Sequence, residues 1–159
     1  HGHFAKANPL WQNAHHAHAP WLAIFQHPGH YISPNWYPSK ARDHKAVPTW
    51  NYQAVHVHGT LTLIDDPQHV LAMLATLTAA HESHEKQPWQ LSDAPEAWLQ
   101  GLTRAIVCFE MRITRIAGKY KLNQHHSAEN RHGAIAGLQA QHHADANHVA
   151  AQMLKIAEK

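Results

Sequence analysis

The sequence predicts an α+β protein whose strands form an antiparallel β-barrel with helices at its periphery. Residues 49–65 and 105–116 each alternate apolar and polar side chains over many positions, as expected for long strands with two different faces. Strands and helices do not alternate regularly along the chain, which disfavours a doubly wound parallel sheet. We expect about five strands and about four helices from these patterns.

The composition is that of one globular domain. The chain has 159 residues, of which 44% are hydrophobic and 15% are charged, and its formal net charge is +2. A chain of this kind can bury a core and is not expected to be disordered. It has no apolar run long enough to span a membrane, and its small net charge does not by itself indicate nucleic-acid binding.

The first residue and the single cysteine bear on the cellular location. The chain starts with His1 in place of Met, and no signal-peptide pattern follows, so we expect a processed or N-terminally incomplete chain in the cytoplasm. One cysteine, Cys108, excludes an intramolecular disulfide, which agrees with a reducing compartment. Because Cys108 lies in the middle of an apolar strand, we expect an inert buried thiol and no catalytic nucleophile.

The first third of the chain predicts short elements separated by prolines. In order, these are the end of a strand, a short helix that Asn8 and Pro9 begin, a buried apolar strand, an aromatic strand that Pro34 interrupts, and a polar loop. The corresponding residues are 1–7, 8–11, 20–26, 30–37 and 38–46.

The centre of the chain predicts the two long strands and two helices. Gly59 marks a bulge or bend in the strand over residues 49–65. Asp66-Pro67 then begins a helix that runs to about residue 84. Asp93 and Glu96 resemble a capping box for a second helix that runs to residue 104. After the strand over residues 105–116, we expect Gly118 to turn the chain.

The last part of the chain, residues 127–159, predicts a C-terminal helical segment of a single domain that covers residues 1–159. Ser127 can cap a helix that runs to about residue 141, although Gly133 and Gly137 lower its helix propensity. A final amphipathic helix is expected over residues 145–157.

The 19 histidines raise the hypothesis of a metal site. They are spread along the chain in small groups that lack known metal-binding spacings; His81 and His84 stand three residues apart, whereas the zincin pattern needs four. His56 and His58 share one face of a strand, but no third ligand is identifiable. We therefore favour surface histidines, expect no metal site, and keep a haem- or metal-binding protein as an alternative. The charge of these side chains will change strongly in mild acid.

Sequence motifs for dinucleotide binding, the P-loop and the serine-hydrolase elbow are absent, and we assign no catalytic residue. Three segments instead carry a resemblance. They read FQHPGHYISPNWY (residues 25–37), VPTWNYQAVHVHG (47–59) and GKYKLNQ (118–124). They closely resemble the PaiB family, whose members carry segments like F-Q-G-P-H-x-Y-I-S-P-S-W-Y, V-P-T-W-N-Y-x-A-V-H-x-x-G and G-K-x-K-x-S-Q-N. Here Pro28-Gly29 replaces the usual G-P order, and Asn35 replaces a serine.

The resemblance covers essentially the whole chain and implies a split β-barrel of the flavin-binding type, similar to pyridoxamine-phosphate oxidase. It also implies a homodimer with FMN at the subunit interface, and strands that would precede His1. Family members are described as FMN-binding negative transcriptional regulators that act on sporulation and protease synthesis. DNA contact, direct or through a partner, is therefore expected, although we find no convincing helix-turn-helix. The alternative is a flavin-dependent oxidoreductase, in which FMN would carry the hydride chemistry.

FMN needs cations and N–H donors for its phosphate and a flat apolar surface for its ring. The resemblance implies that His3 and Lys6 grip the phosphate. Lys119 and Lys121 could supply further charge. Three more residues could contact the ring or the ribityl chain, namely Ser33, Trp50 and Asn51. The alternative is that Trp50 packs in the dimer interface and that both lysines are solvated.

Overall fold

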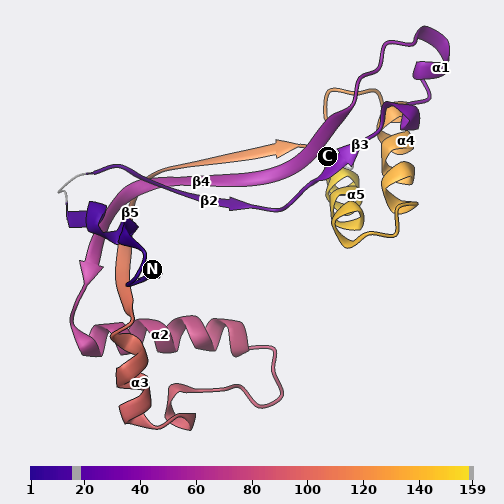
Figure 1. Ribbon diagram of the computed structural model, residues 1–159. Helices are drawn as coiled ribbons and strands as arrows, with labels where there is room; N and C mark the ends of the chain where they lie inside the picture. The colour runs from indigo at the N-terminus through magenta and orange to yellow at the C-terminus, as the bar shows by residue number, and fades with distance from the viewer. Residues whose placement is uncertain (16–18, 158–159) are drawn as a thin grey trace. The chain divides into compact units, whose positions relative to one another are not determined.

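The structure is a computed structural model that describes residues 1–15 and 19–157 (Figure 1). Its internal contacts divide the chain into two compact units. Unit 1 comprises residues 1–22 and 58–115, and unit 2 comprises residues 23–57 and 116–159. The chain passes between the units inside three strands, β2 (Trp21–Gln26), β4 (Thr49–Ile64) and β5 (Ile106–Lys121). Each unit is therefore built from segments that lie far apart in the sequence.

Five strands and several helices confirm the predicted α+β class, and the strand pairs are antiparallel. The strand order is β1-β5-β4-β2, with β3 paired with β4 outside this path, so the sheet that the described residues form is not closed. β1 (Gly2–Ala5) pairs with the start of β5, from Gly2 opposite Phe109 to Ala5 opposite Ile106. β3 (His30–Ile32) pairs with the start of β4 and places Tyr31 opposite Trp50.

In unit 1, helix α2 (Pro67–Glu82) covers the buried thiol of Cys108. The Asp66 side chain caps this helix by accepting a hydrogen bond from the His69 N–H at 2.7 Å, as the sequence predicted. Val70 and Met73 of α2 form a core cluster with Cys108. Three further elements complete the unit, the 3₁₀ helices η1 (Pro9–His15) and η3 (Leu91–Asp93) and the helix α3 (Glu96–Thr103).

In unit 2, α4 (Ala128–Gln139) and α5 (Ala144–Ala157) lie side by side at the end of the chain (Figure 1). Ser127 caps α4 as predicted, because its hydroxyl accepts from the Asn130 N–H. The 3₁₀ helix η2 (Pro34–Trp36) and the short helix α1 (Lys40–Asp43) follow β3. The largest fully buried side chains of the unit's core are Ile32, Leu122, Leu138, Val149 and Met153.

The two glycines of α4 have a packing role that the sequence did not predict. A Cβ at Gly133 would lie 2.1 Å from the backbone oxygen of Trp36, and one at Gly137 would lie 2.3 Å from the indole ring of Trp36. These distances are far shorter than any real contact, so only glycine lets Trp36 approach the helix this closely. The lower helix propensity of Gly133 and Gly137 is offset by this contact with the core.

Four local predictions were wrong. β2 is exposed where we expected a buried strand, with Ile24 at 55% and Phe25 at 65% relative exposure. Gly118 lies inside β5 and does not turn the chain, because β5 continues to residue 121. The capping box joins Gln90 to Asp93 in η3 and does not begin α3, which follows Pro95. The polar loop at residues 38–46 contains α1.

Within the described residues, no helix combines the length and the apolar character needed to cross a membrane.

The variant Gly137→Ala should lower the free energy of unfolding by about 1–3 kcal/mol, the usual cost of an overpacked site. Alanine is the better helix former by about 1 kcal/mol, so any loss of stability must come from the clash with Trp36. Urea denaturation measures the effect. The matched control is Gly118→Ala, where a Cβ would meet no atom within 4 Å and stability should change little. A more stable Gly137→Ala protein would contradict the close packing.

Candidate functional site

Five of the seven predicted site residues belong to unit 2, where Lys121 and Trp50 lie on different strands, β5 and β4. The Lys121 ammonium at the end of β5 donates a hydrogen bond of 2.6 Å to the Thr49 hydroxyl at the start of β4. Trp50 follows Thr49, is 54% exposed, and meets the ring of Tyr31 edge-on at 6.4 Å. Lys119 is also exposed on β5. Thr49 and Trp50 are consecutive residues of β4, so their side chains point to opposite faces of the strand, and the Trp50 indole does not share a surface with the Lys121–Thr49 pair.

Asn51 and Ser33 have structural roles in unit 2. Asn51 has no exposed surface; its amide donates to the Met153 sulfur at 3.4 Å, and its Oδ1 has no hydrogen-bond partner among the described residues. A buried amide oxygen without a partner is costly, so Asn51 is a point of strain in the core. The Ser33 hydroxyl accepts from the Asn35 N–H and caps η2.

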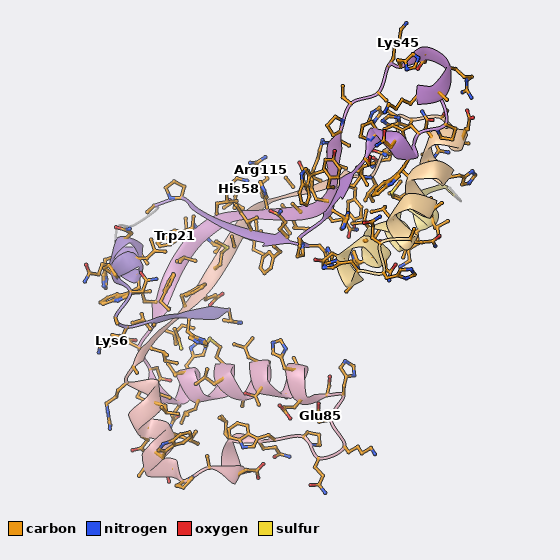
Figure 2. The ribbon with its side chains drawn as sticks, turned by 45° about the vertical axis from the view of Figure 1, so that its right-hand side comes forward. Lys6, Trp21, Lys45, His58, Glu85 and Arg115 are labelled. Carbon is orange, nitrogen blue, oxygen red and sulfur yellow. The ribbon has the colours of Figure 1, made fainter. Side chains whose placement is uncertain are left out.

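The other two predicted residues, His3 and Lys6, belong to unit 1. His3 lies on β1 opposite Cys108, and Lys6 follows β1 (Figure 2). The Lys6 side chain lines a pocket of about 280 Å³ beside Cys108 and Arg104. Both His3 and Lys6 are exposed, so the imidazole and the ammonium are accessible to solvent.

Unit 2 also contains an open groove of about 440 Å³ that the sequence did not predict. Its lining combines exposed aromatic rings with amide side chains and small apolar residues. These residues are Phe25, Gln26, His27, Gln53, Ala54, Val55 and Tyr120. Phe25 and Tyr120 are 65% and 54% exposed, which leaves flat apolar surface available. Phe25 stands in one of the motif segments and Tyr120 in another, but no spacing pattern places them in one groove.

A cluster of histidines lies beside this groove. The rings of His27 and His148 stack with centroids 3.7 Å apart and planes 9° from parallel. His148 Nε2 lies 2.9 Å from Gln53 Oε1, and the Asp145 carboxylate lies 3.9 Å from His27 Nε2. Burial, then the charges of His27 and Lys155, lower the pKa of His148, and Asp145 raises it by a smaller amount. The stack therefore favours an uncharged His148.

Gly29 holds the chain beside this stack close to β4. Its φ is +73°, and a Cβ there would lie 2.5 Å from the Asn51 backbone oxygen. Only glycine combines this left-handed backbone with so close an approach. The His27 N–H also donates to the Gln53 carbonyl at 3.2 Å. The connection between β2 and β3 is thereby fixed against the strand that carries Trp50.

One histidine of unit 1, His58, takes part in a different contact. The Arg115 guanidinium donates to His58 Nε2 at 2.6 Å, and Figure 2 shows the two side chains together. The Thr114 hydroxyl donates to the His58 carbonyl at 3.2 Å, so β4 and β5 are joined by side chains as well as by pairing. Among the described residues, no group of three or more His, Cys, Asp or Glu side chains is arranged to hold a metal ion.

The Cys108 thiol is 1% exposed, and burial raises its pKa, which keeps it protonated at neutral pH. The prediction of a buried thiol is therefore confirmed.

The residues of unit 2 fit the chemistry of FMN. The ring needs a flat apolar surface, and Phe25, Trp50 and Tyr120 each expose more than half of their surface. The phosphate needs cations, and Lys119 and Lys121 carry ammonium groups on the same strand as Tyr120. These residues stand in an antiparallel α+β domain. Residues 1–115, which include Phe25 and Trp50 but not Lys119, Tyr120 or Lys121, match the family described as "Putative FMN-binding domain".

Individual relatives place the chain more closely. "Protease synthase and sporulation protein PAI 2" of Bacillus subtilis is 31% identical over 152 residues, which cover 96% of this chain and 70% of the relative. An uncharacterized protein of Aspergillus fumigatus is 34% identical over 134 residues, 74% of this chain and 51% of that protein. One of Saccharomyces cerevisiae is 50% identical over 68 residues, 42% and 39% of the two chains. The chain belongs to the PaiB family, and it spans about half the length of the Aspergillus relative.

Acid should destabilise unit 2 through His126, whose ring stacks on buried Tyr37 at 4.8 Å. Burial, and then the charge of His125, lower the pKa of His126 from its usual value of 6.5. The folded chain therefore binds fewer protons at His126 than the unfolded chain does. The contribution of neutral His126 to the free energy of unfolding is therefore complete above about pH 6.5. It is lost as the pH falls from there through the pKa that His126 has in the folded chain.

Urea denaturation at stepped pH measures this effect. The variant His126→Gln should show a shallower loss of stability in mild acid than the unmodified protein. His132→Gln, at an exposed position of α4, should keep the original slope. If the free energy of unfolding falls with pH at the same slope in all three proteins, His126 does not contribute to the loss of stability in acid.

Proposed function

We propose that this protein is a regulator of the PaiB type that acts as a homodimer and binds FMN. The observation that carries the proposal is that unit 2 exposes three aromatic side chains, Phe25 on β2, Trp50 on β4 and Tyr120 on β5, and that β5 also carries Lys119 and Lys121. Exposure of an aromatic ring to water is unfavourable, whereas the same ring can stack on a flavin or pack against a second subunit. The family assignment supports the same cofactor.

In this proposal the residues of the chain bind and orient the flavin. The rings of Trp50, Phe25 and Tyr120 offer flat contacts to its apolar ring system, and Lys119 and Lys121 hold its phosphate by charge-assisted hydrogen bonds. When bound, FMN supplies a redox-active ring. His3 and Lys6 of unit 1 are further candidates for phosphate contacts.

The regulatory role rests on the family. The Bacillus subtilis relative is named for protease synthase and sporulation. A net charge of +2 gives only weak attraction to DNA. We therefore propose that control of transcription acts through the dimer, by direct DNA contact or through a partner protein.

The double variant Lys119→Gln/Lys121→Gln should weaken FMN binding about a hundredfold or more, because each of the two lost charge-assisted hydrogen bonds costs about 1.5–3 kcal/mol. Quenching of flavin fluorescence on titration of the purified chain measures the dissociation constant. Riboflavin lacks the phosphate, so its affinity should not change. Lys45→Gln, an exposed lysine elsewhere in unit 2, is the matched control (Figure 2). No binding of FMN to the unmodified chain would overturn the cofactor proposal.

The homodimer is tested at Trp50. Trp50→Ala should raise the dimer dissociation constant about tenfold or more, since buried tryptophans are the commonest anchors of protein interfaces. The loss of its contact with Tyr31 should cost the fold only about 1 kcal/mol. Trp98→Ala is the matched control, because Trp98 is 57% exposed on α3 of unit 1. Analytical ultracentrifugation measures the dimer dissociation constants of both variants and of the unmodified protein. The proposed interface would be contradicted by an unmodified protein that is monomeric, or by equal effects of the two substitutions.

A further inference from the structure

His27 and His148 form the closest aromatic stack in the described part of unit 2, and they come from different elements. His27 lies in the connection between β2 and β3, and His148 lies on α5. Gln53 of β4 joins both: its backbone carbonyl accepts from the His27 N–H, and its side-chain oxygen accepts from His148 Nε2. The stack therefore ties the connection, β4 and α5 together.

The hydrogen bonds assign the protons on the two rings. The Gly29 N–H donates to His27 Nδ1 at 3.4 Å, so the proton of a neutral His27 lies on Nε2, toward Asp145. His148 Nε2 faces the Gln53 side-chain oxygen, so its proton lies on Nε2 as well. A second proton on His27 would oppose the Gly29 N–H. A second proton on His148 would place a charge 3.7 Å from the neighbouring ring.

The charged groups around the stack act in both directions. On α5, Lys155 opposes a positive charge on His148, whereas Asp145 favours one. Asp145 also lies 3.9 Å from His143 Nδ1, and the His143 ring is 5.9 Å from that of His30 on β3. Tyr120 of β5 lines the adjoining groove. The Asp145 carboxylate thus lies close to both His27 and His143, and Lys155 opposes a positive charge on His148.

We propose that the His27–His148 stack is a proton-sensitive clasp, which holds α5 to the β2–β3 connection at neutral pH and opens in mild acid. Two imidazolium rings at this distance repel each other, and burial of His148 adds to the cost of charging it. Opening separates His27 from α5 and alters the groove that His27 and Gln53 line. The clasp gives unit 2 a pH-dependent conformation that does not depend on FMN, and it goes beyond the proposed function.

The test uses the full chain without added flavin. Histidine Cε1–Hε1 signals in ¹H–¹³C NMR spectra, from about pH 8 to about pH 5, follow the titration of each ring. Amide hydrogen exchange, corrected for its intrinsic pH dependence, follows the opening of α5. We expect α5 exchange to accelerate about tenfold or more relative to α4 as His148 titrates. The α4 amides are the internal reference, because the titration of His126 affects the whole unit.

Two variants separate the clasp from a purely structural contact. His148→Gln and His27→Gln each remove one of the two stacked imidazole rings. In either variant, amide exchange in α5 should depend on pH in the same way as amide exchange in α4. His132→Gln, an exposed histidine on α4, should keep the behaviour of the unmodified chain. The proposal is overturned if α5 protection relative to α4 does not change with pH in the unmodified chain. It is equally overturned if a folded His148→Gln or His27→Gln protein keeps the full pH dependence.

Discussion

Close contact between a side chain and a helix backbone, which only glycine permits, determines how unit 2 packs. Gly133 and Gly137 stand four residues apart on one face of α4, and Trp36 occupies the space that their missing side chains leave. Trp36 packs there against the core, and its neighbour Tyr37 and nearby Ile32 are buried in the same cluster as α4 and α5. The position of η2, and with it the path from β3 to α1, depends on this contact.

The three motif segments, which are far apart in the sequence, fold together in unit 2. Residues 25–37 and 118–124 lie wholly within it, as do residues 47–57 of the second segment. Much of the motif consists of residues with packing roles. Gly29 lies against β4, Asn51 is buried below α5, and the Asn123 amide donates to the Tyr37 hydroxyl at 3.0 Å. The family motif therefore specifies the core of unit 2 as well as the exposed Trp50 and the two lysines of β5.

The fold also distinguishes among the histidines, which look alike in the sequence. In the described residues of unit 2, burial lowers the pKa of His126 and His148, while many other imidazoles lie in solvent. Stacking on Tyr37 and on His27 places these two rings where a charge is unfavourable. Nothing marks His148 in the sequence, since it is a single polar residue within an amphipathic helix. Its role follows only from contact with His27 and Gln53, which are distant in the sequence.

The sequence by itself determined the elements whose signals are local. Asp66 and Ser127 cap α2 and α4 as predicted, and the long strand over residues 49–64 follows from its alternating pattern. The motifs also identified the family, and several candidate flavin contacts lie within them. Only the tertiary structure decided the exposure of β2, the continuation of β5 through Gly118, and the meeting of His27 with His148. Capping and periodicity act over a few residues, whereas burial and strand pairing depend on partners that are distant in the sequence.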